Sequence, residues 1–494
     1  MTIRAVGRAR QRVRETGCIT GVKRGGAAKV AENVAQRTSS LPAPLAFAPM
    51  ADERPWAGRR LHLIGLGGAG MSGYARVATQ LGAAVSGSDR ADSAGLRALA
   101  ALGVEVHVGH GPANVPAGDG VEVVHSTAIA PDNPERVAAR ERGLPDHPRA
   151  DLLAQISALK RTIAIGGAHG KTTTTSMATH VLLRCGLEPS YLIGGALTTT
   201  GLNADWGAGE WLVVEADESD RSMLSIDADV AVVTNVELDH HSTYGSLAEV
   251  REAFRELLAG APQAVLWDRP EILALRGDAP YVAFDVPAPS LDGEGSSFAW
   301  RGERVRLRVP GAHNARNAAA ALEACVLAGA EPAAAAAALA DFAGAGRRFQ
   351  ALGVTRTGAR VVDDYAHHPT EVAATIDAAR TQGPRRVVAV FQPHLYSRTQ
   401  RLAREFGAAL ARADVAAVLD VYPARERAED FPGVGGLLVA EATADAAGGR
   451  TVLWLPSFEV AEPVLRGLLR DGDLCLVLGA GDVDELGRRL AATG

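Results

Sequence analysis

A lysine at the end of a glycine-rich turn is the residue best suited to chemistry in this sequence. An apolar run over residues 162–165 enters the turn 166–170, which Lys171 and four threonines follow. Glycines let backbone N–H groups curve around phosphate oxygens, and a helix that begins here adds the positive end of its dipole. The pattern departs from G-x-x-x-x-G-K-[ST] at Ile165, where glycine is standard. The expected strand and helix on either side still predict a phosphate-binding turn rather than an exposed lysine.

Carboxylates follow two further apolar runs and suggest a magnesium site beside this turn. Residues 211–214 run into Glu215 and an acidic segment that ends at residue 220, and residues 230–234 run into a segment that contains His240. Mg²⁺ prefers oxygen ligands, and the Thr172 hydroxyl after the lysine is a further candidate. The alternative for the acidic segment is a solvated loop, and His240 alone has an equally plausible structural interpretation.

A third segment, residues 309–321, has the side chains to recognise a base. His313 and Asn317 are four residues apart and share one face of the expected helix, and Asn314 is three residues from Asn317. Amide side chains both donate to and accept from a base edge. An N-terminal helix cap is the alternative.

The first globular segment carries the pattern G-x-G-x-x-G. Residues 61–64 form an expected strand, a helix follows to residue 80, and a second strand covers residues 84–89. Asp89 lies 19 residues beyond Gly70, where a dinucleotide-binding fold places its ribose carboxylate. Taken alone this predicts NAD, but the same turn serves any nucleotide with a diphosphate. Expected strands over 104–108 and 121–125 complete a parallel unit, with Ser126 and Thr127 at the carboxyl end of the last one.

Four more expected strands near the C-terminus end in polar or glycine-rich loops, which predicts a parallel sheet with a ligand-binding edge. They cover residues 361–362, 387–391, 415–419 and 474–478. His367, His394 and Arg398 follow the first two and can hold a carboxylate or a developing charge, although each has a structural alternative. The pair Arg347 and Arg348 either points at phosphate or solvates a linker.

Composition narrows the class of protein. A chain of 494 residues is expected to form two to four domains, and no apolar run reaches the roughly 18 residues that a membrane span requires. The four cysteines are far apart and form no C-x-x-C pair, which fits a reducing cytosol. The net charge is −6, but residues 1–50 carry nine basic and two acidic side chains, leaving −13 for the rest. An acidic body is poorly suited to nucleic acid.

The basic N-terminal segment, residues 1–56, is expected to be a disordered extension; a targeting segment is the alternative. Met50 is a second candidate start of translation.

Taken together, the ordered motifs resemble the Mur ligase family over about residues 60–485. The resemblance implies an α/β chain of three domains: a Rossmann-like N-terminal domain for a UDP-sugar (57–160), a P-loop-type central ATPase domain (161–343) and a Rossmann-like C-terminal domain for an amino acid (344–494). The motifs that carry it are residues 65–73, 167–174, 215–220, 234–240, 311–317, 347–349, 363–371 and 391–399.

The resemblance also implies roles for single residues. Lys171, His367, His394 and Arg398 are the expected catalytic residues, and Thr172, Glu215 and His240 the expected Mg²⁺ ligands. Expected ATP contacts are Gly167, Ala168, His169, Gly170, Lys171, Thr172, Thr173, His313, Asn314, Asn317 and Arg348. Expected UDP-sugar contacts are Gly67, Gly68, Ala69, Gly70, Met71, Ser72, Ser88, Asp89, Ser126, Thr127 and Tyr365.

Four residues depart from the family pattern. Ala168 stands where threonine is usual, and Ala366 where glycine is frequent. Leu395 replaces an arginine of some members, which weakens the case for a side-chain contact with the amino-acid carboxylate at that position. Arg425 follows 422–424 where glycine is common.

The implied reaction is the ATP-dependent joining of L-alanine to the lactyl carboxylate of UDP-N-acetylmuramate, in the cytoplasm, by a monomer or homodimer that binds neither nucleic acid nor membrane. The nearest alternative within the family joins a preformed tripeptide to the same sugar. More distant alternatives are an NAD-dependent oxidoreductase, which leaves Lys171 without a role, and a nucleotide-binding module without catalysis.

Overall fold

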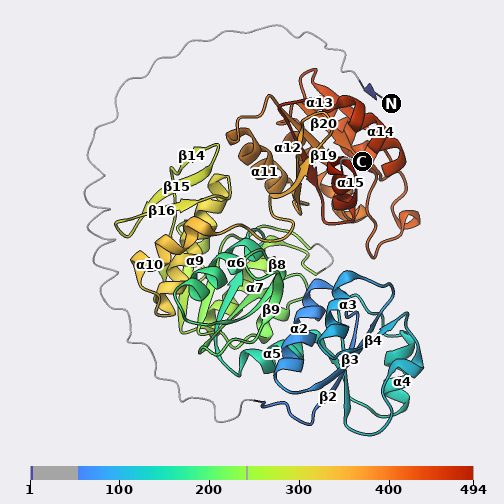
Figure 1. The fold of residues 1–494 in the computed structure, drawn as a ribbon, viewed down its shortest axis with the longest axis vertical. Coiled ribbons are helices and arrows are strands. Elements are labelled where there is room, and N and C mark those ends of the chain that lie inside the picture. Colours follow the sequence, from blue (N-terminus) through green and yellow to red (C-terminus); the bar gives the residue numbers. More distant parts are fainter. Residues whose placement is uncertain (1, 4–53, 241–242, 493–494) are drawn as a thin grey trace.

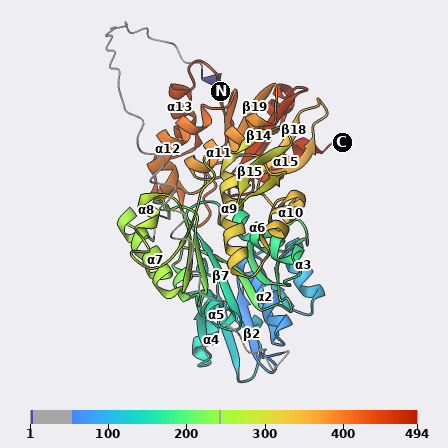
Figure 2. The ribbon, with the colours of Figure 1, turned by 90° about the vertical axis from the view of Figure 1, so that its left-hand side faces the viewer.

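The structure, a computed structural model, describes residues 2–3, 54–240 and 243–492. Three α/β domains follow one another along the chain, drawn in Figure 1 in blue, in green to yellow and in orange to red, and the predicted fold class is confirmed. In Figure 2 the C-terminal domain lies above the central one and the first domain below it. Apart from residues 2–3 and 54–56, the predicted basic extension lies outside the described residues.

The first domain is a five-stranded parallel sheet in the order β4-β3-β2-β5-β6. Two positions need glycine for different reasons. Gly65, in the turn after β2, has a φ of +86°, and a Cβ on Gly87, within β3, would lie 2.4 Å from the carbonyl oxygen of Leu63 on the neighbouring strand. The elements are β2 (Arg60–Ile64), α2 (Ala69–Gln80), β3 (Ala84–Asp89), α3 (Ala94–Ala101), β4 (Glu105–Val108), β5 (Val121–His125), α4 (Pro134–Glu141), β6 (Asp146–Pro148) and α5 (Arg149–Ser157).

The central sheet has the order β13-β12-β11-β7-β10-β8-β9, with only β9 antiparallel to its neighbour. All six residues of β7 are buried, and its neighbours β10 and β11 bring their carboxyl ends beside the turn that follows it. A small antiparallel sheet, β14 to β16, was not predicted; it packs with α9 and α10. The elements are β7 (Arg161–Gly166), α6 (Lys171–Arg184), β8 (Ser190–Leu197), β9 (Leu202–Asp205), β10 (Trp211–Ala216), β11 (Val230–Val233), α7 (Leu247–Gly260), β12 (Gln263–Trp267), α8 (Pro270–Leu273), β13 (Val282–Phe284), β14 (Ser290–Asp292), β15 (Gly295–Trp300), β16 (Glu303–Leu307), α9 (Ala312–Leu327) and α10 (Pro332–Ala338).

The C-terminal sheet has the order β1-β21-β20-β19-β22-β18-β17, in which the edge strands β1 and β17 are antiparallel to their neighbours. The four predicted parallel strands are present, and β21 adds a fifth. Separate apolar clusters cover its two faces, one with α11 to α13 and one with α14 and α15. The elements are β1 (Thr2–Ile3), β17 (Gln350–Val354), β18 (Arg360–Asp364), α11 (Pro369–Thr381), β19 (Arg386–Phe391), α12 (Tyr396–Leu410), β20 (Val415–Val418), α13 (Gly436–Ala446), β21 (Thr451–Trp454), α14 (Phe458–Leu468), β22 (Asp473–Leu478) and α15 (Val483–Ala491).

The two junctions between domains differ in kind. One apolar cluster runs without a break from the first domain into the central domain, where α2 packs on β8 and β9. The clusters of the C-terminal domain contain no residue of the other two domains, and its contacts with them at the site are polar. Polar interfaces permit relative motion more readily than apolar ones. The C-terminal domain is therefore the one free to open and close.

Among the residues that the structure describes, none of the helices combines the length and the apolarity that crossing a membrane requires.

Candidate functional site

The predicted phosphate-binding turn joins β7 to α6 and is held in shape from three sides. Gly167 has a φ of +137°, and a Cβ there would lie 2.0 Å from Thr234 Oγ1. Gly170 has a φ of +82°, and its Cβ would lie 2.6 Å from Asn317 Oδ1. Asn235 accepts a hydrogen bond from the backbone N–H of His169 at 2.9 Å. Glycine is thus required at both ends of the turn, although Ile165 breaks the standard motif.

The Lys171 side chain lies folded inside this turn. Its ammonium donates to the Gly167 carbonyl at 2.7 Å and to both carboxylate oxygens of Glu218 at 2.8 and 2.9 Å. Burial alone would lower the pKa of Lys171, but the carboxylates of Glu218 and Asp217 outweigh burial and raise it. Lys171 is therefore a fixed positive charge at the first turn of a helix, where an anion is also favoured by the helix dipole.

Thr172 and Glu215, two of the predicted metal ligands, are neighbours. The Thr172 hydroxyl donates to Glu215 Oε2 at 3.3 Å, and Glu215 Oε1 accepts from the backbone N–H of Gly194 at 2.6 Å. Burial raises the pKa of Glu215. Arg348, from the C-terminal domain, donates to the same hydroxyl at 3.2 Å. A half-buried carboxylate with a hydroxyl oxygen beside it offers the oxygen ligands that Mg²⁺ prefers.

The third predicted ligand, His240, belongs to a separate line of charged contacts. Its Nε2 lies 3.3 Å from Glu218 Oε1 and 3.8 Å from Asp239 Oδ2. Asp239 in turn accepts two hydrogen bonds from Arg398 Nη2, at 2.9 and 3.1 Å. A line of contacts therefore runs from Lys171 through Glu218, His240 and Asp239 to Arg398 in the C-terminal domain.

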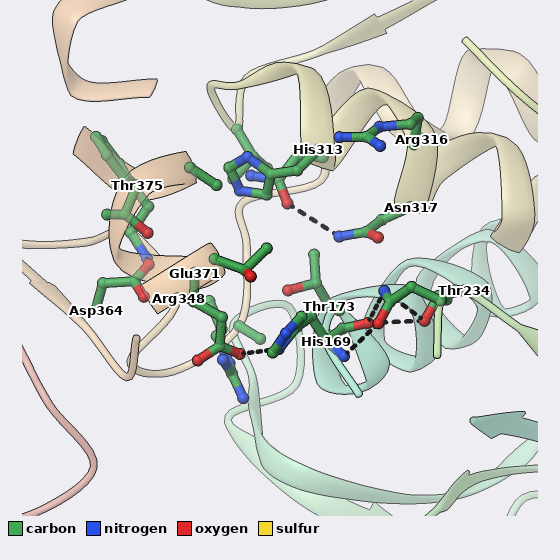
Figure 3. A pocket seen from close by; sticks show the side chains of 18 of the residues that line it. His169, Thr173, Thr234, His313, Arg316, Asn317, Arg348, Asp364, Glu371 and Thr375 are labelled. Atoms are coloured by element: carbon green, nitrogen blue, oxygen red, sulfur yellow. Dashed lines mark hydrogen bonds and ion pairs between the residues drawn. The ribbon is translucent and has the colours of Figure 1, made fainter. Parts of the chain in front are cut away.

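A cavity of about 160 Å³ opens between the turn, the start of α9 and the start of α11 (Figure 3). The central domain lines it with the rings of Trp267 and Phe284 and with the predicted base-recognising residues His313, Asn314 and Asn317. The C-terminal domain contributes Arg348, Asp364, Glu371 and Thr375.

The two asparagines face each other in this cavity, since Asn317 Nδ2 lies 3.4 Å from Asn314 Oδ1. Burial lowers the pKa of His313 to about 4, so its imidazole is neutral at pH 7. Flat apolar rings combined with neutral donors and acceptors suit a heteroaromatic base.

Three of the predicted catalytic residues form one cluster at the carboxyl ends of β18 and β19. The ring of His394 lies 6.1 Å from that of His367 and stacks at 5.8 Å on Tyr422. Arg398 Nη1 lies 3.3 Å from His394 Nδ1. Tyr365 packs against His367 at 5.3 Å and lies beneath the guanidinium of Arg348. The structure therefore brings Tyr365, His367, His394 and Arg398 together, and their roles remain predictions.

The protonation of this cluster follows from its burial. Burial, with a smaller contribution from the nearby charge of Arg398, lowers the pKa of His367 to about 4 and that of His394 to about 3. Burial raises the pKa of Asp364, at the end of β18, to about 6. Both imidazoles are therefore neutral at pH 7.

The predicted UDP-sugar turn, residues 65–70, enters α2 at the carboxyl edge of the first sheet. Asp89, the predicted ribose carboxylate, accepts a hydrogen bond from the backbone N–H of Gly67 at 2.8 Å. Met71 is buried in the core and can meet a ligand only through its backbone. Ser72 Oγ accepts from Asn203 of the central domain at 3.2 Å.

Ser88, also predicted to contact the sugar nucleotide, is fully buried. Its hydroxyl donates to Glu135 at 2.6 Å, and the same carboxylate contacts His62 at 3.0 Å and His110 at 3.3 Å. Ser126 and Thr127 lie at the more open end of β5, where Thr127 is exposed. Gly68 lies in the turn itself, and Ala69 and Gly70 begin α2; the ligand contacts of this whole set remain predictions.

Sequence reasoning missed several residues that the structure places at the site. Arg149, at the start of α5, donates to Asp217 at 2.8 Å and to Asp220 at 2.7 Å and so ties the first domain to the central one. Glu218 was part of a recognised acidic segment, but nothing in the sequence paired it with Lys171. Glu371 belonged to the recognised motif 363–371 but was given no role, and Trp267 carried no signal, since it ends an ordinary strand.

Profiles of one family match each domain of this chain. Residues 60–161 match the Mur ligase family catalytic domain, residues 165–325 the Mur ligase middle domain, and residues 347–481 the Mur ligase glutamate ligase domain.

Curated relatives and solved structures agree with these profiles. The chain is 44% identical to the UDP-N-acetylmuramate–L-alanine ligase of Rubrobacter xylanophilus, over 88% of this chain and 99% of that protein. It is 46% identical to the enzyme of that name from Saccharopolyspora erythraea, over 88% and 93%. The crystal structure of UDP-N-acetylmuramate–alanine ligase from Thermotoga maritima superposes with a TM-score of 0.74 at 28% identity, over 87% and 98%. A murein peptide ligase from Psychrobacter arcticus, 22% identical with a TM-score of 0.63 over 88% and 98%, shares the fold.

The buried cluster of histidines makes a prediction about pH. An unfolded chain protonates His394 near pH 6.5, whereas the folded protein resists protonation down to about pH 3. The unfolded state therefore binds more protons in this window, and stability falls as the pH falls, by roughly 1.4 kcal/mol per pH unit for this group. His394→Asn removes this titrating group, so only the wild type loses this part of its stability as the pH falls. The lead of the wild type over the variant in thermal unfolding midpoint should therefore shrink steadily below pH 6.5. Parallel curves for the two proteins between pH 6.5 and 4 would contradict it.

Proposed function

Because the chain belongs to the Mur ligase family, we propose that it joins L-alanine to the lactyl carboxylate of UDP-N-acetylmuramate, with ATP converted to ADP and phosphate. The chain is an ATP-dependent ligase that forms an amide bond. One observation carries the substrate assignment: relatives 44–46% identical over nearly their whole length bear the name of this activity. The arrangement of the site supports it, since the carboxyl edges of the central and C-terminal sheets meet around Lys171.

We assign the ATP phosphates to the turn 167–173 and the adenine to the cavity beside it. The turn offers backbone N–H groups, the start of α6 and the Lys171 ammonium, all of which favour negative charge. The adenine would lie against Trp267 and Phe284, with Asn314 and Asn317 at its polar edge. Arg348 would approach the phosphates from the C-terminal domain, because it already contacts Thr172.

We further propose that Thr172 and Glu215 hold one Mg²⁺ and that His240 contributes to a second site. Thr172 and Glu215 fit such an ion, because burial raises the pKa of Glu215 and a bound cation would favour the charged carboxylate again. A bound Mg²⁺ would neutralise charge that gathers on the phosphoryl oxygens.

The chemistry requires a carboxylate to become reactive toward an amine. A carboxylate oxygen of the sugar attacks the γ-phosphorus of ATP, the bond to ADP breaks, and an acyl phosphate forms. The neutral amine of alanine then attacks the acyl carbon, phosphate leaves, and the amine loses a proton. Lys171 and the N–H groups of the turn stabilise the negative charge of both steps. His367 and His394, both neutral at pH 7, lie in the cluster where we place the amino acid.

We place the UDP-sugar at the turn 65–70, from which its lactyl group would extend toward Lys171 past Arg149. The amino acid would lie at the cluster of Tyr365, His367 and His394. Arg398 is bound to Asp239, so its first task is to hold the C-terminal domain in place, with Nη1 directed at His394.

We expect a cytoplasmic monomer or homodimer. Cys185, Cys325 and Cys475, the cysteines within the described part of the chain, carry free thiols, as is typical of a reducing compartment.

A phosphate-release assay tests the assignment. Purified full-length protein receives ATP, Mg²⁺, UDP-N-acetylmuramate and one amino acid from a panel, and mass spectrometry identifies the product. We expect release that needs both the sugar and L-alanine, and a product of UDP-N-acetylmuramoyl-L-alanine. Release with the L-alanyl-γ-D-glutamyl-diaminopimelate tripeptide but not with alanine would replace this function with the recycling reaction.

Replacing the lysine of the turn separates chemistry from sugar binding. Lys171→Ala removes the fixed charge at the phosphates, and losing one well-placed donor typically raises a barrier by about 3 kcal/mol. We expect kcat to fall at least about 100-fold, with binding of UDP-N-acetylmuramate by calorimetry nearly unchanged, because the sugar site lies in another domain. Near-normal turnover in this variant would reject the role of the turn.

Magnesium dependence tests the assigned ligands. Glu215→Ala and His240→Ala should each shift the Mg²⁺ concentration for half-maximal activity upward by about tenfold or more, because each removes a donor. Glu256→Ala, an exposed change on α7 of the same domain, is the matched control and should leave the titration in place. If the ligand variants titrate as the control does, these two residues do not bind the ion.

A further inference from the structure

Two imidazoles and a carboxylate from different domains converge beside the phosphate-binding turn. His169 lies in the turn, Glu237 follows β11, and His368 precedes α11. Glu237 Oε2 lies 3.2 Å from His169 Nε2 and 3.8 Å from His368 Nδ1, and the two rings are 4.6 Å apart. One donor atom from each of the three residues lies within 4.8 Å of the other two.

The three side chains match the chemistry of a zinc-type site. Zn²⁺ binds imidazole nitrogen and carboxylate oxygen at about 2.0–2.2 Å, so that tetrahedral ligand atoms stand roughly 3.3–3.6 Å apart. The separations of 3.2 and 3.8 Å from Glu237 are close to this spacing. Two histidines and one glutamate leave a fourth position for water, as in zinc sites with three protein ligands.

Neighbouring groups already support the ligands from behind. His169 Nδ1, the ring nitrogen that faces away from Glu237, lies 3.3 Å from Glu371 Oε1. A carboxylate on the far nitrogen of a ligating histidine fixes the ring and makes it a better ligand. The Thr370 hydroxyl donates to Glu237 Oε2 at 2.9 Å and holds that carboxylate in place.

These residues stand apart from the donors assigned to Mg²⁺. Thr172 and Glu215 supply only oxygen atoms, and His240 contacts Glu218 and Asp239. Imidazole-rich donor sets favour Zn²⁺, Co²⁺ or Ni²⁺ over Mg²⁺.

We propose that His169, Glu237 and His368 form a binding site for a divalent transition-metal ion of the Zn²⁺ type, which bridges the central and C-terminal domains. An ion there ties the start of α11 to the phosphate-binding turn and holds the C-terminal domain docked. The site goes beyond the ligase activity and does not depend on that assignment.

The ion must displace a proton. Burial alone would lower the pKa of His169, but hydrogen bonds to Glu237 and Glu371 raise it to about 9, so the imidazole is charged without metal. The double charge of the ion then takes over the attraction to these two carboxylates. The same pairing that holds the imidazolium is thus available to a metal.

Cobalt titration of the full-length protein tests the proposal. Co²⁺ is added without nucleotide and in excess Mg²⁺, and its visible d–d absorption, which is intense in four-coordinate sites, is followed until Zn²⁺ displaces it. We expect one ion per chain. His169→Gln and His368→Gln should each weaken Co²⁺ binding by about 100-fold or more, because each removes a ligand.

Two matched variants separate this site from others. His240→Gln removes an imidazole from the expected Mg²⁺ region, and His313→Gln removes one from the same cavity; both should retain the absorption. Thr370→Val is an exposed change that deletes only the support of Glu237, and it should weaken Co²⁺ binding by about tenfold. The proposal is overturned if wild type shows no such absorption, if His240→Gln alone abolishes it, or if folded His169→Gln, His368→Gln and Thr370→Val bind Co²⁺ as wild type does.

Discussion

A buried ammonium must have a carboxylate beside it, and much of this site is arranged around that requirement. Lys171 lies inside a glycine turn, where its charge is far from bulk water, and Glu218 contacts it with both oxygens. Glu218 in turn meets His240, His240 meets Asp239, and Asp239 binds Arg398. Removing one member of a buried pair leaves an uncompensated charge, which typically destabilises a protein by about 3–5 kcal/mol. The positions of the turn, the acidic loops and the C-terminal domain are therefore linked.

The two junctions between domains differ in their contacts, one being apolar and the other polar. The first and central domains share a continuous apolar core, reinforced by Arg149 between Asp217 and Asp220. Such a junction fixes the distance between the turn 65–70 and the turn 166–170. The C-terminal domain instead meets the central domain through charged and polar contacts, among them Arg348 with Thr172 and Thr370 with Glu237. Polar contacts exchange readily for water or ligand, so this domain can admit a substrate and then exclude water from the reaction.

Four histidines near the site differ in their charge at pH 7. Burial and the presence or absence of a bonded carboxylate decide whether each one is neutral or charged. His313, His367 and His394 are enclosed without a strongly bonded carboxylate, so their pKa values fall to about 4, 4 and 3. His169 is also enclosed, but Glu237 and Glu371 hydrogen-bond to it and raise its pKa to about 9. Neutral imidazoles can both donate and accept hydrogen bonds, whereas the charged one attracts carboxylates of the central and C-terminal domains. Residue type alone does not distinguish these tasks.

The sequence by itself determined the order of α/β units, the glycine turn before Lys171 and most residues of the later clusters, because periodicity and glycine spacing are local properties. It also placed Glu215, His367, His394 and Arg398 after strands whose carboxyl ends meet. Only the tertiary structure decided that Glu218 pairs with Lys171, that Arg398 crosses to Asp239, and that Asp89 holds the backbone of Gly67. Those pairings join residues that are 22 to 159 positions apart. They depend on which strands become neighbours and how domains dock, and the packing of the whole chain sets both.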